Sequence, residues 1–257
     1  MGPNKAIDED YYSYLTFVSN RVLITETDLK NKFKDCYKLI YMSSEIIAKF
    51  EDLDKRSHID FYLNEMKNDL IISLDLLNMN YLTASKKVLR SSVEAFFRVS
   101  LAIKRYVIYQ ENVKNKNFSV TSELAELKSI IDAHKVYKLT SSSVDFYKDS
   151  EIADIIMELN TFYSELSGSV HVNSIAEFTP KQYLSEYSLL DEPKCFKYLD
   201  MYTKIITNIL LSMLLFLKQV KRFDLHKNKI ALIANFLTPE QEEILESIEI
   251  MPYNHHQ

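Results

Sequence analysis

The scarcity of glycine constrains the fold of this chain more than any other feature of its sequence. Only two glycines, Gly2 and Gly168, occur among 257 residues, whereas an average usage of about 7% would give about eighteen. Sheet proteins use glycine in tight hairpin turns and bulges, and phosphate-binding loops use it where the backbone approaches the ligand. Helices need it only after their C-termini. The sequence therefore predicts an all-α protein.

Apolar residues recur at spacings of three and four along most of the chain, which is typical of helices that bury one side. Prolines and capping residues mark several helix starts, at Pro180, at Pro193, and at Thr238 with Gln241 three residues later. The predicted helices cover residues 28–44, 59–77, 82–109, 124–131, 150–166, 180 onward, 193–217 and 239–249.

Polar stretches interrupt this pattern at 78–80, at 111–118 and at 140–143. We expect each of them to form a break or a loop between helices. Gly168 follows an apolar helical segment, so we expect it just beyond the end of that helix, where a left-handed residue often stands.

The predicted organisation is a single antiparallel helical bundle of about seven to nine helices. The bundle is expected over residues 25–229, after an N-terminal arm over 1–24. A small C-terminal helical appendage and tail are expected over 230–257. No repeat of fixed period is present, which argues against a solenoid.

Charge and cysteine content narrow the classes of function. The net charge of −5 and the pI of about 5.7 argue against a strong attraction of the whole protein to nucleic acid, although a local basic patch is compatible with them. Cys36 and Cys195 lie far apart among aliphatic and aromatic neighbours, so we expect two reduced thiols in the core. No metal or other cofactor is expected, because no zinc-ligand spacing or phosphate-binding loop is present.

Two features bear on location. The chain begins Met1-Gly2-Pro3 and soon becomes acidic, which is unlike a secretory signal. Its most apolar stretch, 205–217, is interrupted by Asn208 and Ser212 and is shorter than the ~20 residues that a membrane span requires. We therefore expect a buried core helix, no membrane association and a cytoplasmic protein.

A line of charge runs along the long helix predicted from Leu82. Arg90, Glu94 and Arg98 step by four and so share one helix face. Two interpretations remain open. The residues form an ion-pair ladder on a solvated face, stabilising by ~0.3–0.5 kcal/mol per pair, or they face a polar cleft.

A second motif ends at His171, three residues after Gly168. Tyr163 and Ser167 precede it at steps of four. An isolated histidine is more often a capping or buried hydrogen-bonding residue than a catalytic one. Because imidazole titrates near neutral pH, an acid–base role for His171 also remains open.

Together these segments carry a family resemblance. A helix that reads Leu-Arg-Ser-x-x-Glu, followed about seventy residues later by Tyr-x-x-Leu-Ser-x-x-x-His, resembles a branch of the HEPN-like superfamily of helical bundles over about 60–220. Proteins of this superfamily are often ribonucleases or nucleotide-binding modules, and many belong to toxin–antitoxin and anti-phage systems. The resemblance implies that Arg90, Glu94 and His171 are catalytic, with Tyr163 and Ser167 beside them as substrate-binding residues.

The sequence departs from the ribonuclease branch at one point. That branch typically carries an arginine followed, after about four to six residues, by a histidine on one helix, so that a cation binds the scissile phosphate while imidazole moves the ribose 2′-hydroxyl proton. No arginine occurs in the helix before His171. Only three residues separate Arg222 from His226, one fewer than this pattern requires. An active site would require Arg90 and His171 to converge from different helices or across a homodimer.

A basic cluster offers a further candidate contact for phosphate. Lys104 and Arg105, with Arg98, are the cations we assign to substrate binding, and Lys114 and Lys116 lie further along the chain. Tyrosines and phenylalanines beside them could stack on bases. The alternative interpretation is a solvated loop beside aromatic residues that belong to the core.

Three functions follow from these features. The first is a HEPN-like protein of a microbial defence or toxin–antitoxin system that acts on or senses RNA or a nucleotide, with metal-independent ribonuclease activity left open. The second is a non-enzymatic interaction module that docks a partner protein encoded in the same operon through amphipathic helices, particularly the acidic segment 240–249. The third is the sensing of a small ligand in the bundle core.

Overall fold

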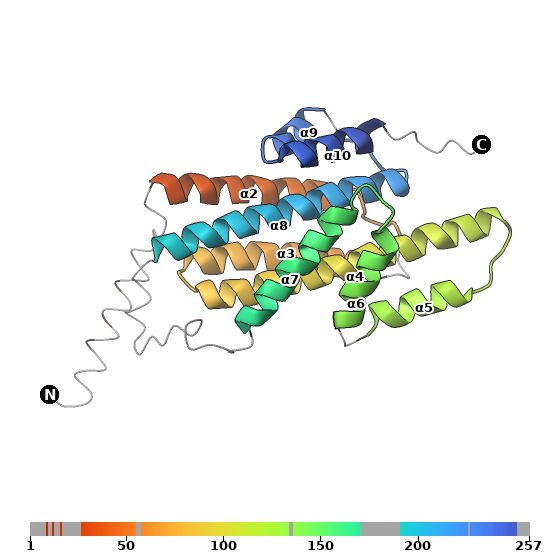
Figure 1. Ribbon diagram of the computed structural model, residues 1–257, viewed down its shortest axis with the longest axis horizontal. Coiled ribbons are helices and arrows are strands. Elements are labelled where there is room, and N and C mark those ends of the chain that lie inside the picture. Colours follow the sequence, from red (N-terminus) through yellow and green to blue (C-terminus); the bar gives the residue numbers. More distant parts are fainter. Residues whose placement is uncertain are drawn as a thin grey trace.

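The protein is an all-α helical bundle, as the glycine content and the apolar periodicity predict (Figure 1). The computed structural model describes residues 27–54, 58–133, 136–170, 191–225 and 227–250, together with Glu9, Tyr12 and Thr16. Within these residues there are nine helices and no strand. The helices are α2 (Thr27–Ala48), α3 (Ile59–Asn78), α4 (Leu82–Lys114), α5 (Ser122–Ile131), α6 (Val136–Tyr147), α7 (Ala153–Val170), α8 (Glu192–Gln219), α9 (Lys227–Ala234) and α10 (Pro239–Ile250).

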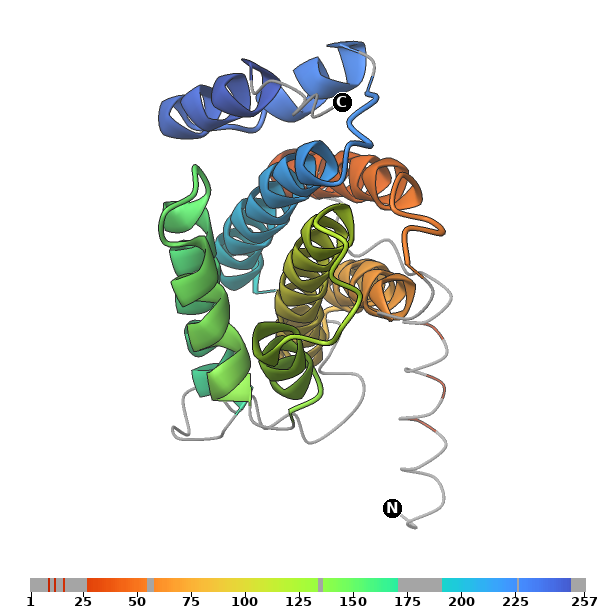
Figure 2. The same cartoon turned by 90° about the vertical axis from the view of Figure 1, so that its right-hand side faces the viewer.

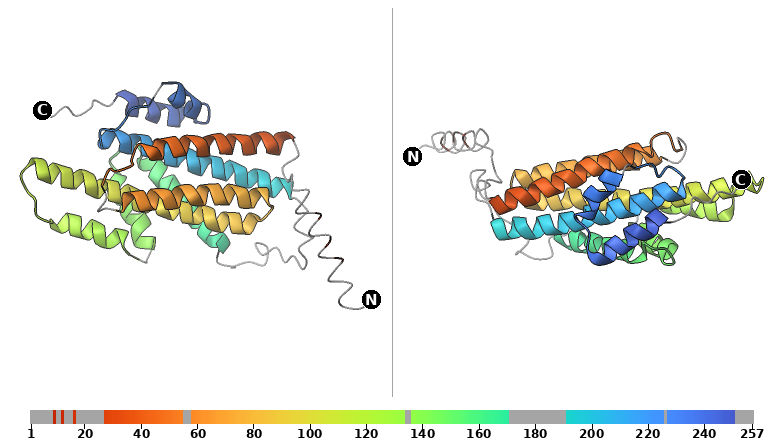
Figure 3. Two further views of the ribbon diagram at one scale, coloured as in Figure 1. Left: turned by 180° about the vertical axis from the view of Figure 1, so that it is seen from behind. Right: turned by 90° about the horizontal axis from the view of Figure 1, so that it is seen from above.

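Long helices form the body of the bundle. α3 and α4 make an antiparallel hairpin, and α2 lies beside α8 with both helices starting at the same end (Figures 1 and 2). α7 packs against α4 and α8, while α5 and α6 flank α4. α9 and α10 lie over α2 and α8, on the side away from α3 and α4 (Figure 3).

The most apolar helix, α8, is the core of this arrangement. Every residue from Ile205 to Leu217 is buried, including Asn208 and Ser212. By length and composition alone α8 could cross a membrane, but 78% of its most apolar stretch lies inside the bundle. Burying one Leu, Ile or Phe side chain stabilises a fold by about 1.5–3 kcal/mol, so α8 holds the surrounding helices together.

The starts of α8 and α10 follow the predicted capping chemistry, whereas α3 begins after His58 without a side-chain cap. Asp191 accepts a hydrogen bond from the Lys194 N–H at 3.2 Å, with Pro193 in the first turn of α8. At α10, the Gln241 N–H donates to Thr238 Oγ1 at 3.3 Å and the Thr238 N–H donates to Gln241 Oε1 at 3.0 Å. This reciprocal pair is a capping box. The start predicted at Pro180 lies outside the described residues.

Several predicted boundaries are wrong, including the end of α2, which is at Ala48, and the start of α7, which is at Ala153. α7 continues through Gly168 to Val170, because the buried apolar side of α7 offsets the ~1 kcal/mol that glycine costs inside a helix. Residues 140–143 lie inside α6, where Ser141 Oγ donates to the Tyr137 carbonyl at 2.8 Å and its neighbours make similar bonds. Hydroxyls satisfied in this way do not break a helix. α4 also continues past 109 to Lys114.

The C-terminal helices share the core of the bundle. Ile230 and Ile233 of α9 and Leu245 and Ile248 of α10 are buried in the same apolar cluster as the inward side of α8. The apolar side of α10 is therefore occupied, and its acidic side faces outward.

Candidate functional site

Arg90 lies at the contact between α4 and α7. Its Nε donates a hydrogen bond to Ser167 Oγ at 3.0 Å, and its Nη2 donates to the Tyr163 hydroxyl at 2.9 Å. The guanidinium carbon lies 5.2 Å from the centre of the Tyr163 ring. The structure thus brings three of the sequence-predicted site residues together.

Helix geometry explains this meeting. Tyr163 and Ser167 are four residues apart on α7 and project from one face, and Leu166 beside them is buried in the core. α4 and α7 run in opposite directions (Figure 1), so the first half of α4 meets the last half of α7. Arg90 is half-buried there, and Tyr163 is 9% exposed.

The partners of Arg90 are both neutral. Among the described residues no carboxylate pairs with its guanidinium, and Ser167 and Tyr163 only orient it. A cation that is partly removed from water and not neutralised by a carboxylate favours the approach of an anion.

Arg98 differs from Arg90 in this respect. Its Nη2 forms an ion pair with Glu94 Oε1 at 3.1 Å and donates to the Ala133 carbonyl at 3.3 Å. Its Nη1 donates to the Ile131 carbonyl at the end of α5. Arg98 is therefore paired with a carboxylate and links α5 to α4, and its predicted role in substrate binding stays a prediction.

Glu94 belongs to an acidic seam between α3 and α4. Glu65 of α3 lies near it. Burial and then the charge of Asp69 raise the pKa of Glu65, the charge of Arg98 opposes that rise, and the charge of Glu94 adds to it. Burial also raises the pKa of Asp69, although a hydrogen bond from Ser91 opposes that rise. Glu94 is thus engaged with Arg98 and this seam, and none of its described contacts is with Arg90.

Lys104 and Arg105 lie elsewhere on α4. Fourteen residues separate Arg90 from Lys104, which is about 21 Å along a helix axis. Arg105 Nε donates to the Leu124 carbonyl at 3.2 Å and so ties α5 to α4. The predicted basic edge and the Arg90 contact are two separate places on the molecule.

The histidines at the centre of the sequence argument, His171 and His226, lie outside the described residues. Arg222, which precedes His226, has a structural environment. Its Nη1 donates to the carbonyls of Lys49 at 3.2 Å and Glu51 at 2.5 Å. It therefore holds the turn that follows α2, where carbonyls lack helical partners.

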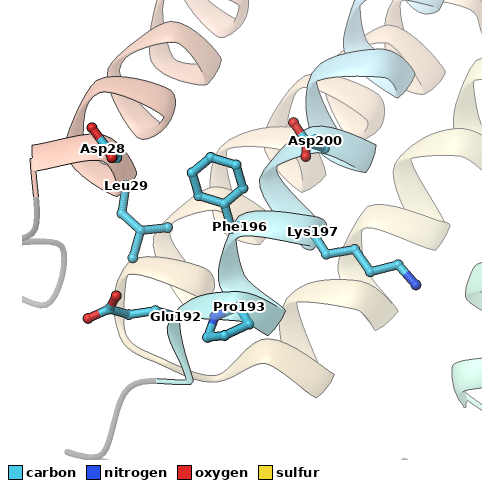
Figure 4. A pocket seen from close by; sticks show the side chains of 7 residues that line it. All are labelled: Asp28, Leu29, Glu192, Pro193, Phe196, Lys197 and Asp200. Atoms are coloured by element: carbon cyan, nitrogen blue, oxygen red, sulfur yellow. The ribbon is translucent and has the colours of Figure 1, made fainter.

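An open cleft of about 590 Å³ lies between the starting ends of α2 and α8. Figure 4 shows the Phe196 ring between the two helices, with Asp28 on one side and Asp200 on the other. Lys32 forms an ion pair with Asp200, and its Nζ lies 3.9 Å from the centre of the Phe196 ring. Because carboxylates dominate its lining, this cleft is poorly suited to a phosphate.

Sequence reasoning missed a second cleft, between α7, α8 and α10. Thr207 lines it, and Asn208, the next residue, is completely buried. Asn208 Nδ2 donates to Glu158 Oε2 at 2.8 Å, and Gln241 Nε2 donates to Asn208 Oδ1 at 2.7 Å. The available signal was the polar pair Thr207–Asn208 inside an otherwise apolar helix, because such groups are buried only with partners.

No family model matches this chain, and no curated protein or solved structure matches it.

Among the described residues, no group of three or more His, Cys, Asp or Glu side chains is placed to hold a metal ion. Cys36 and Cys195 are both buried and are not joined in a disulfide, as the sequence predicts. Burial raises the pKa of Cys36 to about 11, which makes it a poor nucleophile.

Proposed function

We propose that this protein acts on or senses RNA or a nucleotide, and that Arg90 binds a phosphate group at the α4–α7 contact. One observation carries the proposal. Arg90 is half-buried and is oriented by two neutral hydroxyls, those of Ser167 and Tyr163, while the nearby Arg98 is neutralised by Glu94.

The remaining donors of Arg90 suit a phosphate. A guanidinium carries five N–H donors in a planar fork, and the contacts with Ser167 and Tyr163 use two of them. The others can bind two oxygens of one phosphate. Because the fork is already oriented, less side-chain entropy is lost on binding.

The charge of the whole chain limits the size of the ligand. A net charge of −5 opposes the binding of a long polyanion. A nucleotide or a short single strand, held at one or two phosphates, is compatible with it. The resemblance to HEPN-like proteins points to the same class of ligand and to a microbial defence or toxin–antitoxin role.

The catalytic form of the proposal adds His171. This residue follows Ser167 by four positions, so the covalent chain alone keeps their Cα atoms within about 14 Å. In this form Arg90 binds the scissile phosphate, and the His171 imidazole removes the proton of the ribose 2′-hydroxyl. The 2′-oxygen then attacks phosphorus to form a 2′,3′-cyclic phosphate, while the bond from phosphorus to the 5′-oxygen breaks and that oxygen leaves with a proton taken from water.

Phosphate binding is tested by fluorescence anisotropy with a labelled single-stranded RNA and with a labelled nucleotide. Arg90→Ala is expected to weaken binding about tenfold or more, since a charge-assisted hydrogen bond contributes about 1.5–3 kcal/mol. Arg90→Lys keeps the charge but loses the fork, so it should give an intermediate loss. Lys128→Ala on α5 removes the same charge from an exposed site and is the matched control.

Equal affinity of the Arg90→Ala and Lys128→Ala variants would contradict the proposal. The catalytic form is tested separately, by separating RNA fragments on denaturing gels and by growth after expression. His171→Ala should abolish cleavage and toxicity while leaving RNA binding within about twofold. If the original protein cleaves no RNA, the binding form of the proposal stands and the catalytic form fails.

A specific observation also favours a second function, the docking of a partner protein. Tyr37 and Tyr41 on α2 are each 62% exposed, and Leu232 on α9 is 50% exposed. They surround a cleft of about 430 Å³, and exposed aromatic side chains of this kind often anchor interfaces. Tyr41→Lys should abolish co-elution with a partner encoded beside this gene in size-exclusion chromatography; unchanged co-elution would exclude this surface.

A further inference from the structure

The cleft between α7, α8 and α10, which α2 also lines, contains a buried polar group that has no partner within the described part of the chain. Its volume is about 490 Å³. Thr207 is the most buried residue of its lining, at 1% exposure, and Thr207 Oγ1 has no hydrogen-bond partner among the described residues. An unpaired buried hydroxyl is destabilising and uncommon in native proteins. A ligand in the cleft would satisfy it.

The charges around the cleft indicate the sign of that ligand. Asp154 and Glu158 come from α7, and Glu240 comes from the first turn of α10. None of these three carboxylates forms an ion pair within the described part of the chain, and the described partner of Glu158 is the neutral amide of Asn208. Lys204 is the one lining lysine without an ion pair among these residues, because Lys32 pairs with Asp200.

The spacing of the carboxylates indicates the shape of the ligand. They are contributed by two different helices that line the cleft, α7 and α10, and α2 adds Asp35, which pairs with Lys38. They are not grouped closely enough to coordinate a metal ion. Positive charges spread along a flexible organic chain would reach both helices, and the ammonium N–H groups would donate to the carboxylates and to Thr207 Oγ1.

We propose that the cleft between α7, α8 and α10 binds an organic polycation with at least two amino groups, a linear polyamine being the class that fits. One amino group binds between Asp154 and Glu158, and another binds at Glu240. Such a ligand ties the start of α10 to α7. This site is distinct from Arg90, and its existence does not depend on the proposed function.

Thermal unfolding with spermidine at constant ionic strength tests the proposal. Spermidine at a hundred times its dissociation constant should raise the unfolding midpoint by about 5–10 °C. Thr207→Val removes the unpaired hydroxyl, so it should leave the ligand-free midpoint unchanged or higher and weaken spermidine binding about tenfold. Thr207→Ser keeps the hydroxyl and should keep the ligand-induced shift.

Two further variants separate the cleft from general attraction to an acidic protein. Asp154→Asn should weaken spermidine binding, whereas Glu123→Gln, in the first turn of α5, removes a matched charge outside the cleft and should not. The proposal is overturned if spermidine causes no shift, if sodium chloride at equal ionic strength reproduces the shift, or if the Asp154→Asn and Glu123→Gln variants respond alike.

Discussion

Arg90 Nε donates to Ser167 Oγ at 3.0 Å, across 77 positions of sequence. The bond fixes the rotation of the guanidinium, while the Tyr163 hydroxyl fixes its other edge at 2.9 Å. Two neutral acceptors therefore orient a charge without cancelling it. A substitution can therefore remove either hydroxyl while the positive charge of Arg90 stays in place.

Ser167→Ala removes one orienting hydroxyl and leaves the Arg90 charge in place. Because one neutral hydrogen bond contributes about 0.5–1.5 kcal/mol, RNA or nucleotide binding should weaken about three- to tenfold. Ser164→Ala is the control, since Ser164 lies on the same helix and, among the described residues, its hydroxyl donates to the Asn160 carbonyl of α7. Anisotropy titrations of both variants check this; equal affinities would show that orientation by Ser167 is unimportant.

Glu65→Gln should stabilise the protein at neutral pH. Burial, with the charges of Asp69 and Glu94, raises the pKa of Glu65 in the folded state. At pH values between the ordinary and the raised pKa of Glu65, the folded state binds more protons than the unfolded state. The free energy of unfolding therefore falls as the pH rises through this range. The benefit of Glu65→Gln is therefore present above the raised pKa and disappears below the ordinary one.

Urea unfolding at neutral pH and near pH 4 measures this dependence. The Glu65→Gln variant should show a higher midpoint than the original protein at neutral pH and a smaller difference at the acidic pH. Glu126→Gln, an exposed substitution on α5, is the control for the loss of one carboxylate. A constant difference at both pH values would contradict the role of burial.

Gly168→Ala should raise the stability of the protein by about 0.5–1 kcal/mol, or about 1–4 °C in unfolding midpoint. Gly168 lies inside α7, and an added Cβ would meet no atom within 4 Å. A glycine in the left-handed region would instead make alanine destabilising. Calorimetry therefore decides between the helical position and the helix-ending position that the sequence alone predicts.

Both cysteines should be unreactive in the folded protein. Cys36 and Cys195 are buried, and burial raises the pKa of Cys36 to about 11. Ellman's reagent at pH 8 should react with neither thiol before guanidinium is added and with both afterwards, because only the thiolate reacts. Rapid reaction in the native state would show that α2 opens away from α8.

The helical content of the fold could be predicted from sequence because it depends on local periodicity and capping. The starts of α8 and α10 follow directly from Asp191, Pro193 and the Thr238–Gln241 box. Residues 140–143 could not be placed correctly, since their hydroxyls bond backward to helix carbonyls such as that of Tyr137. Composition alone does not distinguish this from a loop.

The candidate site was only partly visible in the sequence. The residue spacing places Arg90, Glu94 and Arg98 on one face, but the direction in which each turns depends on its neighbours. Arg98 meets the end of α5, whereas Arg90 meets α7. The cleft beside Thr207 was not predictable, because its walls come from helices that are distant in sequence.

The Glu158 carboxylate determines which groups donate and which accept in a row of hydrogen-bonded side chains that ends at the N-terminal cap of α10. Glu158 can only accept, so Asn208 presents its amide nitrogen to it and its carbonyl oxygen to Gln241. Gln241 must then donate from its own nitrogen, which leaves its oxygen for the Thr238 N–H. The same glutamine side chain thus caps the start of α10 and binds that helix to α8. A glutamate at position 241 could still accept from the Thr238 N–H, but it has no N–H to donate to Asn208.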